Sequence, residues 1–185
     1  MDLLVRDGRR ATTVQKLTVE AIADRAKVSK ATIYRWWPSK AAVVIDAFME
    51  NHLSHVRIPE GLPVRDALLA HLKLLISRYA GSQGKLIAQI IAECQYDLAT
   101  LHDFRTRFWN ERYAAVEKLM QRGIDEGVFR ADIDPGSAAQ LFYAPVYLHL
   151  LFGLGQLDDS LAERLVELGI QGIAARPEAG TTTDR

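Results

Sequence analysis

The spacing of apolar residues near the N-terminus predicts two short helices joined by a tight turn. The first helix carries apolar residues at the i, i+3, i+4, i+7 spacing of one buried face; they are Val19, Ile22, Ala23 and Ala26. Thr18 and Ser29 stand where the two helices begin, and both hydroxyls suit a helix N-cap. The second helix covers residues 30–37, with Ile33 and Trp37 directed inward. Two short helices that share a small core are typical of a helix-turn-helix unit.

Helical spacing continues through the rest of the chain, and no segment alternates apolar and polar residues as a strand does. We expect further helices over residues 39–55, 64–79, 85–94, 101–125, 135–152 and 160–173. Prolines and glycines predict breaks at 57–63 and 81–84. Pro145 lies inside one expected helix and predicts a kink, and Asp159 or Ser160 is the expected cap of the last helix.

The helix expected at 135–152 is apolar nearly all round, and the last helix has one apolar face. Together they carry more apolar surface than one small domain readily hides. We therefore predict that two copies of the chain share a four-helix interface, as a homodimer. The chain has 185 residues, 49% hydrophobic and 25% charged, which is ordinary for a soluble globular protein. Its most apolar run, residues 141–155, is too short to span a bilayer. With Cys94 as the single cysteine, we expect a cytoplasmic protein without a disulfide.

Charge is divided unevenly along the chain, although the formal net charge is +0. Residues 1–40 hold nine Lys and Arg against four Asp and Glu, a net charge of +5. Residues 41–185 hold 14 basic and 19 acidic residues, a net charge of −5. A basic N-terminal unit joined to an acidic body is expected when only the first part contacts nucleic acid.

The outward face of the second helix has the chemistry of a DNA contact. Lysine and arginine neutralise phosphates, hydroxyl groups bond to phosphate oxygens, and small methyl groups contact thymine. A helix N-terminus also attracts phosphate through its free amides. A plain helical hairpin with a solvated basic face is the alternative. The predicted DNA-binding residues are Thr18, Ser29, Lys30, Ala31, Thr32, Tyr34, Arg35, Trp36 and Lys40.

Three sequence motifs in this region resemble the tetracycline-repressor (TetR) family of transcriptional regulators. They are Thr-Val-x-x-Ile-Ala at 18–23, Val-Ser-x-x-Thr-x-Tyr at 28–34 and aromatic-Pro-Ser-Lys at 37–40. The resemblance implies an all-α fold with an N-terminal helix-turn-helix head and a C-terminal helical bundle for ligand binding and dimerisation. We place the head at 1–50, the effector-binding and dimerisation domain at 51–176 and a flexible tail at 177–185.

The head departs from the family pattern at three places. Lys27 stands where the family usually has glycine, and a left-handed backbone there would cost lysine about 1 kcal/mol. Trp36 replaces a smaller or basic residue, so its indole N–H either contacts phosphate or packs within the protein. The first helix of the family is longer, whereas residues 1–5 supply one turn and 8–15 resemble an extended loop. Either the start is truncated or the head is thinly supported.

Large aromatic residues with polar tips lie on the two helices that would flank a central cavity. Such a lining suits a mostly apolar small molecule held by a few polar contacts, although core packing explains the same residues. The candidate effector-binding residues are Phe108, Trp109, Tyr113, Tyr143 and Tyr147. His71 and His149 lie beside apolar positions, as core histidines or as ligand contacts. We expect Cys94 to be buried and inert.

The patterns together predict a dimeric, ligand-responsive regulator that binds double-stranded operator DNA, with a repressor favoured. The chain shows no phosphate-cradling glycine loop, nucleophile elbow or metal-ligand cluster, so we expect no enzyme activity, metal or cofactor. His52 and His55 have no third ligand nearby and are taken as surface residues. Two alternatives stay open: a DNA-binding accessory factor without an effector, and a carrier or enzyme with a vestigial head.

Overall fold

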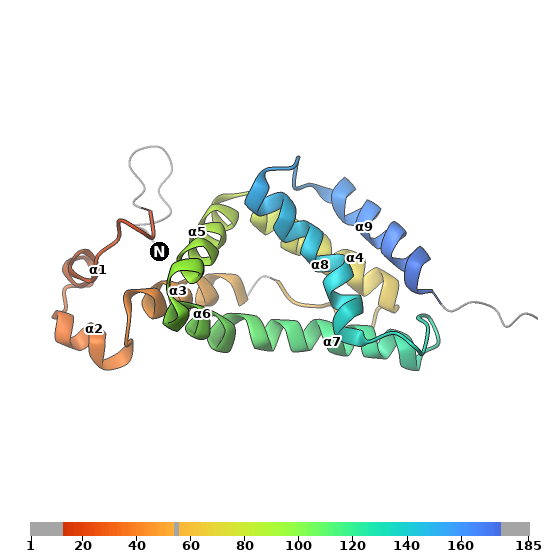
Figure 1. Ribbon diagram of the computed structural model, residues 1–185, viewed down its shortest axis with the longest axis horizontal. Coiled ribbons are helices and arrows are strands. Elements are labelled where there is room, and N and C mark those ends of the chain that lie inside the picture. Colours follow the sequence, from red (N-terminus) through yellow and green to blue (C-terminus); the bar gives the residue numbers. More distant parts are fainter. Residues whose placement is uncertain (1–12, 54–55, 175–185) are drawn as a thin grey trace, which may run out of the picture.

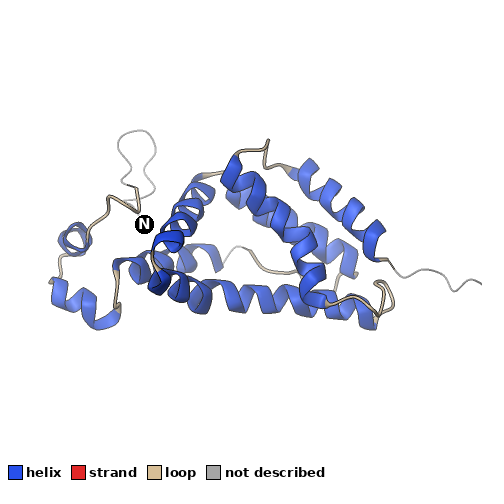
Figure 2. Ribbon diagram, viewed as in Figure 1, coloured by secondary structure: helices blue, strands red, loops and turns tan. Residues whose placement is uncertain are grey.

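The computed structural model describes residues 13–53 and 56–174, and over these residues it is helical without a strand of two or more residues (Figures 1 and 2). The all-α prediction is therefore confirmed. The predictions for residues 1–12, His55 and the tail at 177–185 lie outside the described residues, as does the side chain of His52. The helices are α1 Val19–Ala26, α2 Lys30–Trp36, α3 Lys40–Leu53, α4 Val64–Tyr79, α5 Ser82–Tyr96, α6 Leu98–Phe104, α7 Asn110–Asp125, α8 Pro135–Phe152 and α9 Asp159–Ile173, with a π-helical turn η1 at Arg105–Trp109.

The helix-turn-helix unit is α1 and α2, and its local chemistry follows the prediction. The Thr18 hydroxyl accepts from the amide of Ala21 at 3.2 Å, and the Ser29 hydroxyl accepts from the amide of Thr32 at 3.1 Å. Lys27, in the turn, has φ 56° and ψ 41°, the left-handed conformation that glycine adopts without strain. The cost anticipated for lysine at this position, about 1 kcal/mol, therefore applies.

Two hydrophobic clusters of unequal size hold the molecule together. The small one joins Val19, Ala23 and Ile33, with Trp37 and Val43 packed against them. The large one fills the body, formed by α4 to α9, and includes the inner residues of α3 as well. The α1–α2 unit lies at one end of the molecule and α9 at the other (Figure 1). Because α3 packs on both clusters, it connects the head to the body, and the boundary predicted after residue 50 stays a prediction.

The break predicted at 81–84 is wrong in part, because α5 begins at Ser82 and includes Gly84. A Cβ at Gly84 would lie 1.9 Å from the carbonyl oxygen of Tyr79, so this glycine permits the close approach of α5 to the end of α4. The same role is seen at Gly169 of α9, where a Cβ would lie 2.2 Å from Cε1 of Phe142. Glycine marks a helix break and a close helix contact alike, which is why the pattern misled here.

Two helix starts also differ from the prediction. The long helix predicted from residue 101 begins at Leu98, where the Asp97 carboxylate caps the amides of Ala99 and Thr100, and it is interrupted by η1. The last helix is capped by Asp158 rather than by Asp159 or Ser160, through a bond from the amide of Leu161 at 3.0 Å. None of the described helices is long and apolar enough to cross a membrane.

Candidate functional site

The outward face of α2 is open to solvent, as expected of a DNA contact. Ile33 is buried with 5% of its surface exposed, whereas Trp36 is 65% exposed. The side chains of the other predicted contacts on α2 are also exposed; these are Lys30, Ala31, Thr32, Tyr34 and Arg35. The guanidinium of Arg35 lies 5.5 Å from the ring centre of Trp36, which supports a cation–π contact. The exposed indole agrees with the DNA-facing alternative for Trp36 rather than with packing.

Other predicted DNA-binding residues have partners inside the protein. The Lys30 ammonium pairs with the carboxylate of Glu20 on α1, which raises the pKa of Lys30 and lowers that of Glu20. Both side chains are exposed, so this pair contributes little to stability, and a phosphate can replace the carboxylate. The Lys40 ammonium donates to the backbone carbonyls of Val14 and Gln15 at 2.9 and 3.3 Å. Lys40 thus fixes the segment before α1, and its contact with DNA stays a prediction.

A single carboxylate links the end of the recognition helix to the body. The indole N–H of Trp37 donates to Oδ2 of Asp46 on α3 at 2.8 Å. Nη1 of Arg107 donates to the same oxygen at 3.0 Å and to Oδ1 at 3.2 Å. Arg107 belongs to the π-helical turn η1, so head and body share a charge-assisted hydrogen-bond link. No feature of the sequence pattern pointed to this link, because Arg107 is 61 residues from Asp46 along the chain.

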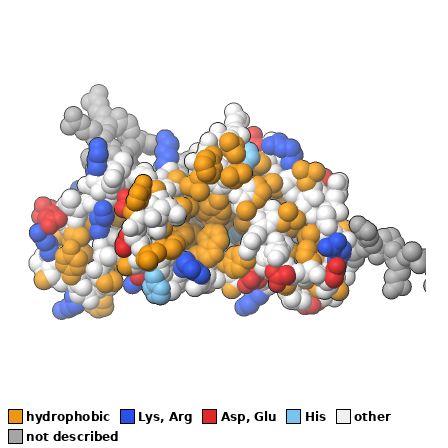
Figure 3. Space-filling model, in the orientation of Figure 1, with side chains coloured by type: hydrophobic (Ala, Val, Ile, Leu, Met, Phe, Trp, Pro, Cys, Tyr) orange, Lys and Arg blue, Asp and Glu red, His pale blue; other side chains and the backbone are white. Residues whose placement is uncertain are grey.

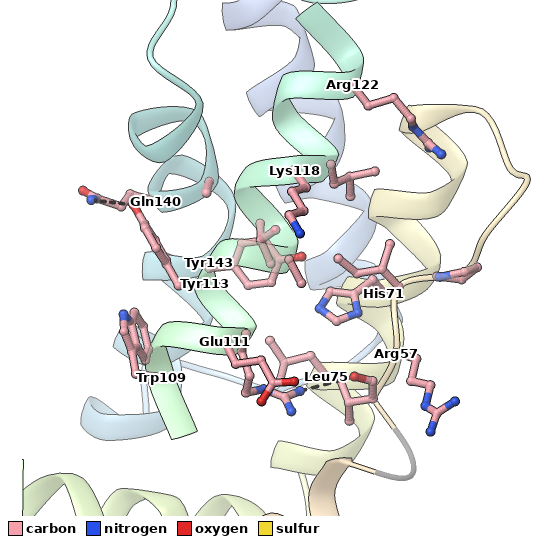
Figure 4. Close-up of a pocket in the computed structure, with 18 of the residues that line it drawn as sticks. Arg57, His71, Leu75, Trp109, Glu111, Tyr113, Lys118, Arg122, Gln140 and Tyr143 are labelled. Carbon is pink, nitrogen blue, oxygen red and sulfur yellow. Dashed lines mark hydrogen bonds between the residues drawn. The ribbon is translucent and has the colours of Figure 1, made fainter. Parts of the chain in front are cut away.

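The body encloses a cavity of about 840 Å³ between α4, η1, α7, α8 and the segment at residues 56–61 (Figure 4). All five candidate effector residues line it, namely Phe108, Trp109, Tyr113, Tyr143 and Tyr147. The Trp109 and Tyr113 rings stack with centres 6.0 Å apart, and the Trp109 and Tyr147 rings lie 5.5 Å apart. A volume of this size lies in the range of small-molecule sites.

Tyrosine hydroxyls on the cavity wall and next to it differ in their hydrogen-bond partners. Tyr113 donates to the carbonyl of Gly136 at 2.9 Å and accepts from Gln140 at 3.1 Å. The hydroxyls of Tyr79 and Tyr147 lie 3.2 Å apart, and burial raises the pKa of both phenols. The hydroxyl of Tyr143 is buried without a hydrogen-bond partner among the described residues.

His71 and Arg112 add nitrogen donors to the same wall. His71 is 6% exposed and its Nδ1 has no partner among the described residues. Burial, the largest influence, lowers the pKa of His71 to about 4; a hydrogen bond to the backbone of Arg57 opposes this, and the charge of Arg112 adds to it. The sequence analysis left His71 open as a core histidine or a ligand contact, whereas it did not identify Arg112 as a cavity residue. Its only signal is its place four residues after Phe108, over whose ring its guanidinium lies at 5.1 Å.

Two residues considered for chemistry are placed away from the cavity wall. The thiol of Cys94 is buried, with its sulfur 3.9 Å from the carbonyl oxygen of Thr100. Burial raises the pKa of the Cys94 thiol to about 11, which keeps it protonated and unreactive. His149 lies on α8 with a buried Nδ1 that has no partner among the described residues, and it is not part of the cavity lining.

Large apolar side chains are exposed on α8, on the turn that follows it and on α9. Figure 3 shows hydrophobic side chains gathered over α8 on the face in view. We call this set of six the α8–α9 patch: Leu141, Leu148, Leu151, Phe152, Leu154 and Leu168. An exposed apolar surface of this kind is typical of an interaction site.

Comparisons with known proteins agree with both parts of the chain. Residues 1–47 match the family described as bacterial regulatory proteins, tetR family, and residues 58–168 match the tetracyclin repressor-like C-terminal domain. The HTH-type transcriptional regulator YdeS of Bacillus subtilis (strain 168) is 35% identical over 175 residues, covering 94% of this chain and 85% of YdeS.

Solved structures with the same fold include two regulators. The TetR family transcription regulator SCO0332 superposes with a TM-score of 0.76 and 26% identity, covering 87% of this chain and 89% of that one. The regulator FadR from Bacillus subtilis, in complex with stearoyl-CoA, superposes with a TM-score of 0.69 and 18% identity, covering 86% and 90%. At that identity, the second likeness supports the fold alone.

Proposed function

The chain belongs to the TetR family of transcriptional regulators, and from that premise we propose a repressor that leaves its operator when a small, mostly apolar effector binds. It is a DNA-binding transcriptional regulator, and members of this family are not enzymes. The observation that carries the effector role is the cavity of about 840 Å³ in the body, lined by aromatic side chains. FadR from Bacillus subtilis, which shares this fold, is in complex with stearoyl-CoA, so a regulator of this fold can hold an amphiphilic ligand.

We assign the DNA contact to the exposed face of α2. Arg35, Lys30 and Tyr34 reach phosphates, while Ala31 and Thr32 at the start of the helix meet base edges in the major groove. Ser29 and Thr18 act mainly as caps that hold the two helices rigid, and their backbone amides lie beside the phosphates. On binding, phosphate competes with Glu20 for the ammonium of Lys30.

We propose that the repressor is a homodimer joined through the α8–α9 patch. A single head has a small core and a short recognition helix, so it offers few contacts to DNA. Two heads related by two-fold symmetry would reach successive major grooves, about 34 Å apart, of a near-palindromic operator. The patch lies on the body, at a distance from α2 along the molecule, which leaves both heads free for DNA (Figure 1).

We propose that the link through Asp46 couples the cavity to the head. Phe108 and Trp109 line the cavity, and Arg107 on the same π-helical turn holds Asp46. A ligand that displaces these aromatic rings would move Arg107, and through Asp46 and Trp37 it would change the position of α2. Coupling of this kind is reciprocal, so the operator must weaken ligand binding by the same factor.

Fluorescence anisotropy with a fragment of the protein's own promoter tests this function, in the absence and presence of a panel of apolar compounds. We expect specific binding at physiological salt and release by those compounds that also raise the melting temperature of the free protein. Absence of specific binding would contradict the DNA role. Binding that no stabilising compound weakens would instead favour an accessory factor without an effector.

A further inference from the structure

Arg112 brings a positive charge to the cavity wall without a matching negative charge. Its guanidinium donates to the carbonyl of Val56 at 3.3 Å and lies over the ring of Phe108. Among the described residues it forms no ion pair with a carboxylate, Glu111 included. A guanidinium has five N–H donors, so most of them are unused. Burial lowers the pKa of Arg112, yet an arginine keeps its charge at neutral pH, and a half-buried charge without a partner is costly.

Two further side chains on the same cavity wall each have a buried polar atom without a hydrogen-bond partner in the described part of the chain. His71 and Tyr143 line the cavity with ring centres 5.7 Å apart, and Figure 4 shows them directed into the same space. Nδ1 of His71 and the hydroxyl of Tyr143 are both buried and unpartnered among the described residues. Arg112 lines the same cavity, so the three side chains face one enclosed space, which we call the polar corner. Buried polar groups of this kind are normally satisfied by a ligand or by water.

The cavity lining as a whole carries more positive than negative charge. Four basic residues line the cavity, Arg57, Arg112, Lys118 and Arg122, against two acidic ones, Glu60 and Glu111. The charge of Arg122 is paired with the carboxylate of Glu126, with Nε 3.6 Å from Oε1, and its guanidinium also donates to the carbonyl of Leu62. The remaining wall near Arg112 is apolar, with Leu75, Val116 and Phe108. The cavity therefore combines one anion-attracting corner with a larger apolar space.

We propose that the effector is an amphiphilic carboxylic acid, whose carboxylate is bound by Arg112 together with the Tyr143 hydroxyl. This rests on the proposed effector role of the cavity and specifies the ligand. The guanidinium binds the two oxygens side by side, and the tyrosine hydroxyl donates to one of them. The single N–H of the neutral His71 imidazole is already donated to the backbone of Arg57, so His71 lines this part of the cavity without donating to the carboxylate. The hydrocarbon or aromatic body of the ligand fills the apolar part of the cavity, in contact with Trp109 and Phe108.

Isothermal titration calorimetry on the full chain tests the proposal with matched probes. Decanoate, decanol and decylamine share one aliphatic body, while 2-naphthoate and 2-naphthalenemethanol share an aromatic one. In at least one series, we expect the acid to bind roughly ten- to a hundredfold more tightly than the alcohol, the range expected for a hydrogen bond to a charged group. We expect the amine to bind most weakly. Arg112→Gln should remove the preference for the acid and leave binding of the alcohol within about twofold.

Two further variants separate the carboxylate site from general effects on the cavity. Arg122→Gln removes another lining arginine, one already paired with Glu126, and it should keep the preference for the acid. Tyr143→Phe deletes only an unpartnered hydroxyl, so the protein should fold normally and lose about three- to tenfold in affinity for the acid. Circular dichroism melting of each variant excludes unfolding as the cause.

The outcomes distinguish this proposal from the effector role on which it rests. If acid and alcohol bind equally, if the amine binds best, or if Arg112→Gln keeps the preference for the acid, the carboxylate site is wrong while the cavity remains an effector site. If no probe of either series binds to a protein that still binds its operator, the effector role fails, and the carboxylate site fails with it.

Discussion

The sequence pattern predicts the backbone strain at one residue of this protein but not the surroundings of another. Lys27 replaces a glycine of the family pattern, and the structure holds it in the left-handed conformation. That cost was predictable from the motif, because the motif assigns a turn to this position. His71 was not predictable in the same way, since an apolar neighbourhood in the sequence does not distinguish a packed histidine from one on a cavity wall.

The burial of His71 predicts that the protein loses stability in mild acid. The pKa of His71 is about 4 in the folded protein and 6.5 in the unfolded chain, so between these values the unfolded chain binds more protons. The stabilisation that depends on neutral His71 is therefore fully present above about pH 6.5, and it is lost progressively as the pH is lowered. At pH 5 this single group accounts for a loss of about 2 kcal/mol.

Urea unfolding of the wild type and of His71→Gln at pH 7 and at pH 5 measures this loss. Between pH 7 and pH 5, we expect the free energy of unfolding of the variant to fall by about 2 kcal/mol less than that of the wild type. His102→Gln removes an exposed histidine from α6 and is the matched control, expected to follow the wild type. The same acid-dependent loss in all three proteins would contradict the assignment to His71.

Helices were predictable to the extent that their apolar spacing and caps are regular. Thr18, Ser29 and the following residues predicted α1 and α2 correctly, since capping is local in sequence. The long helix preceding the last two was only partly predicted, because the π-helical turn η1 adds a residue to one turn and shifts the apolar spacing. Such turns often occur at functional sites, and this one carries Arg107 toward the head and Trp109 toward the cavity.

The position of η1 predicts that Arg107 transmits the effect of a ligand without binding it. Arg107→Ala removes the bond to Asp46 and leaves the cavity lining unchanged. We expect ligand affinity within about twofold of the wild type. The factor by which the ligand weakens operator binding should fall at least fivefold, toward the lower end of allosteric coupling.

Anisotropy titrations of the operator with and without ligand give that factor for each variant. The control is Arg105→Ala, which changes an exposed arginine two residues earlier in the same π-helical turn. This variant should keep the full coupling. If Arg107→Ala releases the operator as completely as the wild type, the signal does not pass through Asp46.

The whole molecule combines a basic head with an acidic body, and this division was visible in the sequence. The prediction of a cavity with aromatic walls also agrees with the structure, which brings all five candidate residues onto one lining. Arg112, Tyr143 and His71 come from three different helices, so their meeting in one corner depends on the packing of the body. No local pattern could have revealed it.

The α8–α9 patch predicts that association depends on apolar contacts. Replacing Leu151 and Leu168 by glutamate places charges where two bodies would meet, and we expect the protein to become monomeric at micromolar concentration. Sedimentation velocity measures the change. Leu98→Glu alters a still more exposed leucine at the start of α6, outside the α8–α9 patch, and should leave the dimer intact. A wild-type monomer, or a double variant that remains dimeric, would contradict this interface.

The most direct test of the account is the salt dependence of operator binding by Arg35→Ala. Because we assign Arg35 to a phosphate, its loss should weaken binding at every salt concentration and lower the slope of log K against log salt by about one. Lys85→Ala, which removes an exposed charge from α5 in the body, should reproduce the wild-type slope and affinity. Equal slopes and affinities for Arg35→Ala and the wild type would show that α2 does not hold the DNA, and the central claim would be wrong.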